Sequence, residues 1–248
     1  MKQWHALKTV NSIIFYCSCL LLLAACWQRN DFPEDLQLDA RLLQEPVQKP
    51  VQDPAFAVSR GGVQYRVEPL YSYDLYGVVV SFEHHDGNYS LHRLWNDHLN
   101  VADICVVWGG NAEGVDLNRI RFWNGAFTCN YQTSDQVVWE RFSPEQISNN
   151  HLLIENPHYR KLVQRVRIGD QVRVRGWLAS YSNDTGFARG TSSTRTDQGD
   201  GACETIYVKE FSILRSMDNG WRTLLTIALL GFTGSALTWV IAVARGVF

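Results

Sequence analysis

Histidines crowd one segment of the chain and suggest a metal site. With a nearby carboxylate they are His84, His85, His92, His98 and Asp97. Imidazole nitrogens and carboxylate oxygens are ligands that zinc accepts. If Asp86-Gly87 forms a two-residue hairpin turn, however, His85 and His92 share one face but lie about 13 Å apart along the ribbon. We therefore expect no metal site here and assign the histidines to a polar surface loop, with His92 and His98 as candidate ligand contacts.

A second segment offers positive charge. Residues 189–197 read Arg-Gly-Thr-Ser-Ser-Thr-Arg-Thr-Asp. Arginine and hydroxyl donors bind phosphate or carboxylate through charge-assisted hydrogen bonds, although a solvated loop has the same composition. Arg189 and Arg195 are the main candidate ligand contacts. Trp95 is a further candidate because an indole ring can stack on a sugar or a base, although tryptophans in strands are more often core residues.

Motifs of the common enzyme classes are missing from the sequence. There is no Gly-x-Ser-x-Gly elbow, Walker loop, dinucleotide-binding glycine pattern or His-Glu-x-x-His helix. We assign no catalytic residue and expect no cofactor.

The charges of the chain are nearly balanced. Lys and Arg number 23 against 25 Asp and Glu, for a net charge of -2. This balance removes the broad attraction on which nucleic-acid binders depend, so nucleic acid is not an expected partner.

Apolar residues in the centre of the chain follow a period of two, which predicts half-buried strands. We expect strands at 76–82, 89–94, 104–108, 127–132, 171–178 and 205–214, the last with a change of phase that indicates a bulge. Pro144 and Pro157 stand where helices begin. Arg173 and Arg175, on the polar face of 171–178, extend an anion-binding patch or pair with Glu204 and Glu210 at the surface.

The order of three strands, a helical excursion and two strands resembles the oligonucleotide/oligosaccharide-binding (OB) fold over residues 75–214. Within it, Ile-Gly-Asp-Gln-Val-Arg-Val-Arg-Gly-Trp at 168–177 resembles that fold's fourth strand. The resemblance implies a mainly β, small five-stranded barrel with a helical insertion. It also implies a binding surface made by the loops after the first strand and before the fifth. Here these are the long segments 84–100 and 182–203.

Three cysteines belong to the central domain: Cys105, Cys129 and Cys203. In the barrel order just described, Cys129 and Cys203 lie on neighbouring strands, so a disulfide is expected between them. Cys105 falls within an apolar strand, where a buried thiol is usual. The alternative is that all three cysteines are reduced.

The N-terminus has the order of an export signal, with Lys2 and Lys8 ahead of the apolar run 13–25. The run ends in Leu-Ala-Ala-Cys, which resembles the lipobox of bacterial lipoproteins. That resemblance implies cleavage before Cys26 and a lipid on its thiol. The alternative is an uncleaved signal anchor in which Cys26 is an ordinary small residue.

The C-terminus carries no charge between Arg222 and Arg245, which predicts a transmembrane helix over 221–245.

The proline-rich segment 27–60 is expected to be an extended spacer or a disordered tail. It would leave a domain at 61–216.

These features together predict a membrane-anchored binding or assembly module of the bacterial envelope, with its domain in the periplasm. Its expected partners are the membrane and an envelope protein, or an anionic small molecule or glycan. The alternative function is a metal-dependent envelope hydrolase, in which the histidine loop binds a metal and Arg189 or Arg195 holds a substrate phosphate.

Overall fold

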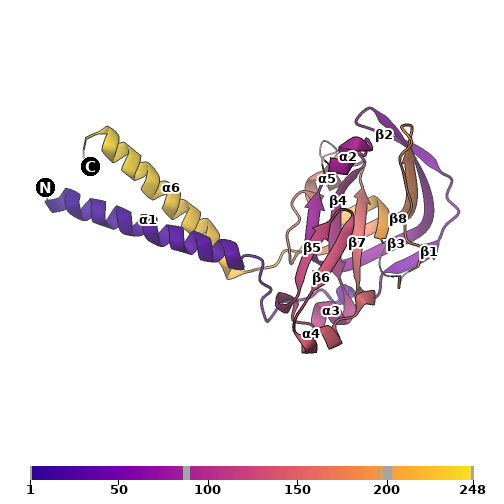
Figure 1. Ribbon diagram of the computed structural model, residues 1–248, viewed down its shortest axis with the longest axis horizontal. Helices are drawn as coiled ribbons and strands as arrows, with labels where there is room; N and C mark the ends of the chain where they lie inside the picture. The colour runs from indigo at the N-terminus through magenta and orange to yellow at the C-terminus, as the bar shows by residue number, and fades with distance from the viewer. Residues whose placement is uncertain (1, 86–89, 195, 198–202, 247–248) are drawn as a thin grey trace. The chain divides into compact units, whose positions relative to one another are not determined.

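A computed structural model describes residues 2–85, 90–194, 196–197 and 203–246. The chain divides into two compact units, Leu36–Met217 and the paired terminal segments Met1–Asp35 and Asp218–Phe248 (Figure 1). The helices are α1 Lys2–Gln28, α2 Ser90–Leu94, α3 Gly109–Glu113, α4 Gln136–Arg141, α5 Pro157–Val163 and α6 Gly220–Ala244. The strands are β1 Val47–Pro50, β2 Phe56–Arg60, β3 Val63–His84, β4 Asn100–Val107, β5 Arg121–Gly125, β6 Thr128–Gln132, β7 Ile147–Leu153, β8 Gln171–Asn183, β9 Ala188–Arg189 and β10 Cys203–Arg215. Short 3₁₀ helices lie at Ala40–Leu43, Leu117–Arg119 and Pro144–Gln146.

The unit Leu36–Met217 is mainly β and is built on one large mixed sheet. In the described part of the chain this sheet has eight strands in the order β1-β3-β4-β7-β10-β8-β9, with β2 also paired to β3. The long strand β3 pairs with β4 along one edge and with β8 along the other. β7 and β10 run parallel, whereas β10 and β8 run antiparallel.

The apolar core lies on one face of these strands. It includes Ile104, Leu152, Val174 and Ile206 from β4, β7, β8 and β10. Successive side chains on a strand point to opposite faces. Residues that alternate with this core, such as Asp103 beside Ile104, therefore lie on the other face of the sheet. That second face carries the polar cluster described below.

Two of the predicted strands differ from the structure, 127–132 in its pairing and 89–94 in its type. Residues 127–132 were expected to be the third strand of the barrel, and they do form a strand, but among the described residues β6 pairs with β5 alone, in a separate two-stranded sheet. The strand that follows β4 in the large sheet is β7, which sequence analysis placed after a helix start at Pro144. That start yields only the 3₁₀ turn Pro144–Gln146, because the next residues pair with β4. The segment expected to return along the first strand is helix α2 at Ser90–Leu94, and the turn Asp86-Gly87 lies outside the described residues.

Other elements match their predictions. Helix α5 begins at Pro157, and the side chain of Asn156 accepts a hydrogen bond from the backbone N–H of His158. Strand β8 alternates as expected, and the phase change in β10 is a register shift between Val208 and Glu210. Arg173 pairs with Asp74 at 2.8 Å and with Glu210 at 3.1 Å, so it belongs to a surface ion-pair network.

The predicted spacer 27–60 is wrong for most of its length. β1 and β2 both pair with β3, and the β unit begins at Leu36 rather than at residue 61. The prolines do not prevent this pairing because Pro50 is the last residue of β1, which stands first in the strand order of the sheet. Proline is tolerated at such edge positions, where its missing N–H costs no ladder hydrogen bond.

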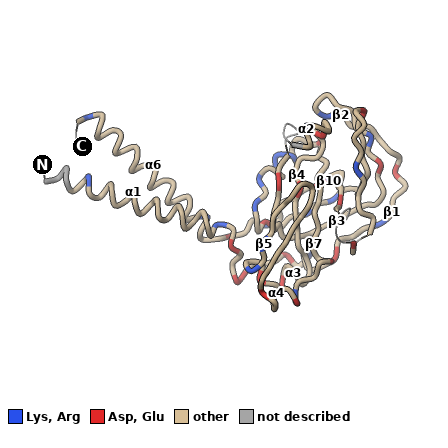
Figure 2. The backbone as a smooth tube through the Cα atoms, in the orientation of Figure 1, with Lys and Arg blue, Asp and Glu red and all other residues tan. Residues whose placement is uncertain are grey.

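The terminal unit consists of α1 and α6. By length and composition, Ala6–Gln28 and Gly220–Ala244 can each cross a membrane. Figure 2 shows charged residues only near the ends of these two helices, whereas both signs are interspersed over the β unit. The helix expected at 221–245 is therefore present. The apolar run 13–25 is part of a longer helix that continues through Cys26 to Gln28.

Candidate functional site

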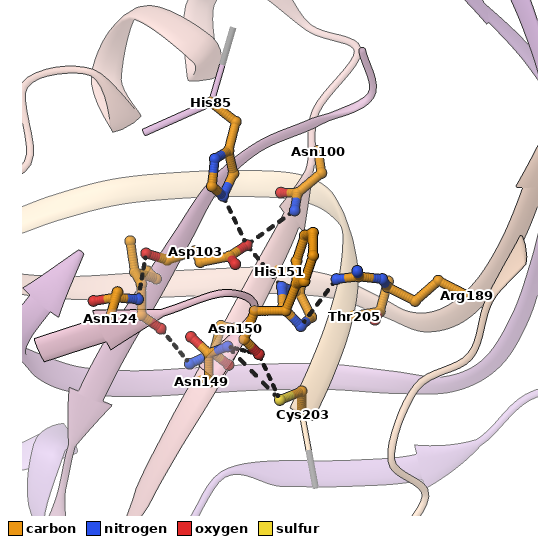
Figure 3. A network of polar contacts seen from close by, with 12 residues as sticks. His85, Asn100, Asp103, Asn124, Asn149, Asn150, His151, Arg189, Cys203 and Thr205 are labelled. Atoms are coloured by element: carbon orange, nitrogen blue, oxygen red, sulfur yellow. Dashed lines mark hydrogen bonds and ion pairs between the residues drawn. The ribbon is translucent and has the colours of Figure 1, made fainter. Parts of the chain in front are cut away.

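Figure 3 shows a buried polar cluster that includes Asp103, His151 and Thr205. These residues belong to β4, β7 and β10, where they alternate with side chains of the apolar core. His151 on β7 stands between Asp103 on β4 and Thr205 on β10, its partners in register on the two neighbouring strands. Asp103 and His151 expose 0% and 2% of their surface. Ionisable groups this deeply buried need partners, because burying an unpaired charge costs several kcal/mol (about 3–5).

Asp103 is the centre of this cluster. Its Oδ1 accepts hydrogen bonds from His151 Nδ1 at 2.7 Å and from Asn100 Nδ2 at 2.9 Å. Nε2 of His85 lies 3.3 Å from the same oxygen. Burial alone would raise the pKa of Asp103, but His151 and His85 together lower it well below 3.8. Asp103 is therefore ionised at neutral pH.

His151 connects this carboxylate to Arg189. Its Nε2 lies 3.3 Å from Nη1 of Arg189, and its Nδ1 faces Asp103. Because a guanidinium can only donate, Nε2 must accept from Arg189, and the ring proton must be on Nδ1. The geometry thus fits a His151 ring that donates from Nδ1 to Asp103 and accepts at Nε2 from Arg189. Arg189 comes from β9, which pairs with β8 in the large sheet, so the cluster also connects β9 to β7 and β4.

A second buried carboxylate lies next to the first. Oδ2 of Asp97 accepts from the Tyr181 hydroxyl at 2.7 Å and faces His92 Nδ1 at 3.2 Å. Burial would raise the pKa of Asp97, but His92 and Tyr181 lower it overall. Burial itself raises the pKa of Tyr181 well above 10. The rings of His92 and His85 stack at 3.9 Å, so the two carboxylates belong to one continuous network.

Phe127 covers the cluster. Its ring lies 3.9 Å from the Arg189 guanidinium carbon and 5.0 Å from the His92 ring. Trp95 stacks on Phe127 and on Phe187, in each case with ring centroids 5.3 Å apart. Phe127 has a φ of 63°, a conformation that costs energy in a bulky residue. The turn after β5 therefore holds this ring over the polar groups at the expense of backbone strain.

No protein-family model, curated protein or solved structure matches this chain. The chemistry of the cluster must therefore be argued from its own geometry.

Three of the five predicted ligand contacts come together. His92, Trp95 and Arg189 all belong to the cluster, and Asn183 donates to the Trp95 carbonyl at 2.7 Å. The two long loops therefore lie beside each other, as predicted. His98 lies elsewhere, with its ring against Gly61. Arg195 lies outside the described residues.

Sequence analysis missed the residues at the centre of the cluster. Asp103 was left just outside the strand expected at 104–108, and His151 was placed in a helical region. Neither segment alternates: Asp-Ile-Cys-Val has one polar residue ahead of three apolar ones, and Ser-Asn-Asn-His-Leu-Leu has four polar residues ahead of two apolar ones, so periodicity gave no signal for either residue. The 13 Å separation predicted for His85 and His92 is also wrong, since α2 replaces the returning strand and brings the rings into contact.

The predicted disulfide Cys129–Cys203 is wrong as well. Cys105 pairs with Cys129, and Cys203 is a free thiol. Because β6 is not in the large sheet, Cys129 does not lie on a strand next to Cys203. Instead the β5–β6 hairpin packs over the sheet and attaches to β4. Burial raises the pKa of the Cys203 thiol, which lies 3.4 Å from the Phe127 carbonyl oxygen. A thiol held protonated in this way is a poor nucleophile.

The position of His151 does not suit a general base. The Nε2 lone pair of His151, which a general base would use, is directed at Arg189. Within the described residues, no group of three or more His, Cys, Asp or Glu side chains is arranged to hold a metal ion. The hydrolase alternative therefore gains no support from this cluster. The cluster holds the cationic side chain of Arg189 between His151 and the Phe127 ring.

Proposed function

We propose that the chain is a membrane-anchored binding module that captures an anionic group with Arg189, at the junction of its two long loops. The observation that carries this proposal is the position of the Arg189 guanidinium. It lies over the Phe127 ring and is linked through His151 to the ionised Asp103. Side chains held in this way lose little entropy on binding, which favours recognition of a ligand.

Arg189 keeps the donors that such a role requires. Stacking on Phe127 uses the flat face of the guanidinium, whereas its N–H groups point outward in the plane of the group. One nitrogen faces His151. The in-plane arrangement allows other N–H groups to donate to a carboxylate, sulfate or phosphate. Arg189 is half-buried, which strengthens such a contact compared with one in bulk water.

The strand pairings support an OB-like barrel as the scaffold. They run from β3 through β4, β7, β10 and β8 and return to β3. The one parallel pair among these strands is β7–β10, and α5 lies between β7 and β8 in the chain. In OB folds the loops at this end of the barrel commonly bind oligosaccharides and oligonucleotides. The ligand class we favour is an anionic glycan or the acidic surface of an envelope protein.

An extracytoplasmic site in a bacterial envelope suits this function. The Cys105–Cys129 disulfide supports an oxidising compartment such as the periplasm. Two apolar terminal helices suit anchoring in the inner membrane. Cys26 is the lipidation site if the N-terminal helix is removed, and an ordinary helix residue if the helix is retained.

The binding test uses the full chain in detergent and a sulfated glycosaminoglycan fragment as the anionic probe. We expect saturable binding that weakens as salt is raised, and a loss of at least tenfold in affinity for Arg189→Gln. Arg175→Gln is the matched control, because Arg175 is exposed and lies on the surface ion-pair network with Glu210. Equal losses for both variants, or affinity independent of salt, would contradict the proposal.

Partner capture tests the choice between a glycan and a protein. A photo-crosslinking residue at Ala188, which is exposed beside Arg189, is introduced into the chain in living bacteria. Recovery of one defined envelope protein, lost when Arg189→Gln is added, supports an assembly role. Crosslinks that form equally with and without Arg189 would exclude it.

A further inference from the structure

The N-terminal helix α1 holds a buried polar side chain within Ala6–Gln28, the stretch that can cross a membrane. Asn11 is 8% exposed, and its Nδ2 donates a hydrogen bond to the backbone carbonyl oxygen of Ser235 on α6 at 3.1 Å. A side-chain amide facing hydrocarbon without a partner costs several kcal/mol, about 4–8 in a fully apolar solvent. Pairing with α6 removes that cost, so Asn11 is suited to a helix that stays beside α6.

The two helices also approach closely at a glycine. A Cβ added to Gly231 would lie 2.4 Å from Oγ and 3.6 Å from Cβ of Ser18 on α1. One turn away, the rings of Phe15 and Phe232 stack with centroids 5.1 Å apart. Small residues at a helix contact are the usual means of close packing in membranes, where no hydrophobic force drives helices together.

The C-terminal end of α1 is capped by the start of α6. Nδ2 of Asn219 lies 3.3 Å from the Gln28 carbonyl oxygen and 2.6 Å from that of Asp31. Nε of Arg222 donates to the Arg29 carbonyl oxygen at 3.0 Å. Carbonyls at a helix end have no donor within the helix and need one from elsewhere. Residues from the far end of the chain thus complete α1.

From the contacts in these three regions we infer that α1 is retained as a permanent membrane span that pairs with α6, and is not a cleaved export signal. On this inference Cys26 is an interior residue of the last turns of α1 and carries no lipid. Both chain ends then lie on the same side of the membrane. The inference is independent of the binding role proposed for Arg189.

A disulfide across the pair tests the inference in the full chain. Ser18→Cys and Gly231→Cys place two Cβ atoms about 3.6 Å apart, within the range for a disulfide. Cys17 and Cys19 are changed to Ala to prevent mispairing, and Cys26 is kept because its fate is in question. The chain carries an N-terminal epitope tag and a protease site inserted after the exposed Glu34. The matched control is Ser18→Cys with Gly234→Cys, because a Cβ at Gly234 has no atom within 4 Å.

The expected result is a tagged chain in the membrane fraction that, after oxidation and cleavage at the inserted site, stays in one piece until a reductant is added. The Gly234 control releases its tagged fragment without reductant. Loss of the tag, with a mature N-terminus at Cys26 bearing an acyl mass, would overturn the inference. A retained tag without a crosslink in the Gly231 variant would overturn the pairing of the helices.

Discussion

At the scale of single residues, Asp103 determines whether the polar cluster can exist. Its carboxylate is fully buried and faces two imidazoles and one amide. Removing one partner from a buried ionic network leaves the others desolvated and incompletely paired, which costs more than the contact itself contributes.

Asp103→Asn should therefore lower the free energy of unfolding by about 3 kcal/mol. The urea midpoint of the full chain in detergent measures this change. Asp184→Asn is the control, because Asp184 is exposed, and it should change the stability by no more than about 0.5 kcal/mol. Similar midpoints for both variants would show that Asp103 is not held in an ionised network.

The same residues predict how stability depends on pH. The folded pKa values of Asp103 and Asp97 lie below 3.8, near where both groups titrate in the unfolded chain. The unfolded state therefore binds more protons in acid, and stability falls as pH falls. The contribution is complete above about pH 5 and is lost progressively as pH falls through 3.8 toward the folded pKa values. Urea midpoints at pH 6, 5, 4 and 3 should decline in the wild type and decline less in Asp103→Asn. Parallel declines would refute this assignment.

The limit of sequence reasoning is clear at these residues. His92, Trp95 and Arg189 were found because charged and aromatic residues in long loops stand out in a sequence. Asp103 and His151 were not, because a polar residue on a strand gives no sign of what covers it. The cover is the β5–β6 hairpin, whose position depends on pairings between residues far apart in the chain.

At the scale of elements, the β5–β6 hairpin depends on its attachment to β4. It pairs with no strand of the large sheet in the described residues, and the disulfide Cys105–Cys129 connects the two. Sequence periodicity identified 127–132 as a strand but not its partner. Either β6 or β7 could have been the strand that pairs with β4, and in the structure it is β7. The pairing of Cys129 was mistaken for that reason.

Loss of this disulfide should destabilise the β unit. A crosslink over a separation of 24 residues stabilises a fold by about 3.5 kcal/mol in the chain-entropy description. Cys105→Ser should therefore lower the urea midpoint strongly, and Cys203→Ser should not. Peptide mapping of the oxidised chain should recover the peptides of Cys105 and Cys129 joined, with Cys203 open to alkylation after unfolding. Recovery of a Cys129–Cys203 peptide would contradict the structure.

At the scale of the whole molecule, the chain begins and ends in the same unit. The sequence predicts a transmembrane helix at the C-terminal end and an export signal or signal anchor at the N-terminal end. It does not predict that the helices pair, because that depends on which face of each one carries Asn11, Ser18 and Gly231. Retention of α1 makes the β unit a domain held at both ends, whichever ligand it binds.

Helix pairing predicts opposite outcomes for two glycines on α6. Gly231→Ile places a branched side chain against Ser18 and should separate α1 from α6, whereas Gly234→Ile meets no atom within 4 Å of its Cβ. Each variant is built in the full chain with an N-terminal tag and the protease site after Glu34, and is cleaved in mild detergent. In the wild type and in Gly234→Ile the tagged helix should co-purify with the rest of the chain. In Gly231→Ile several times more of it should be released. Equal retention in both variants would show that the contact at Ser18 does not hold the helices together.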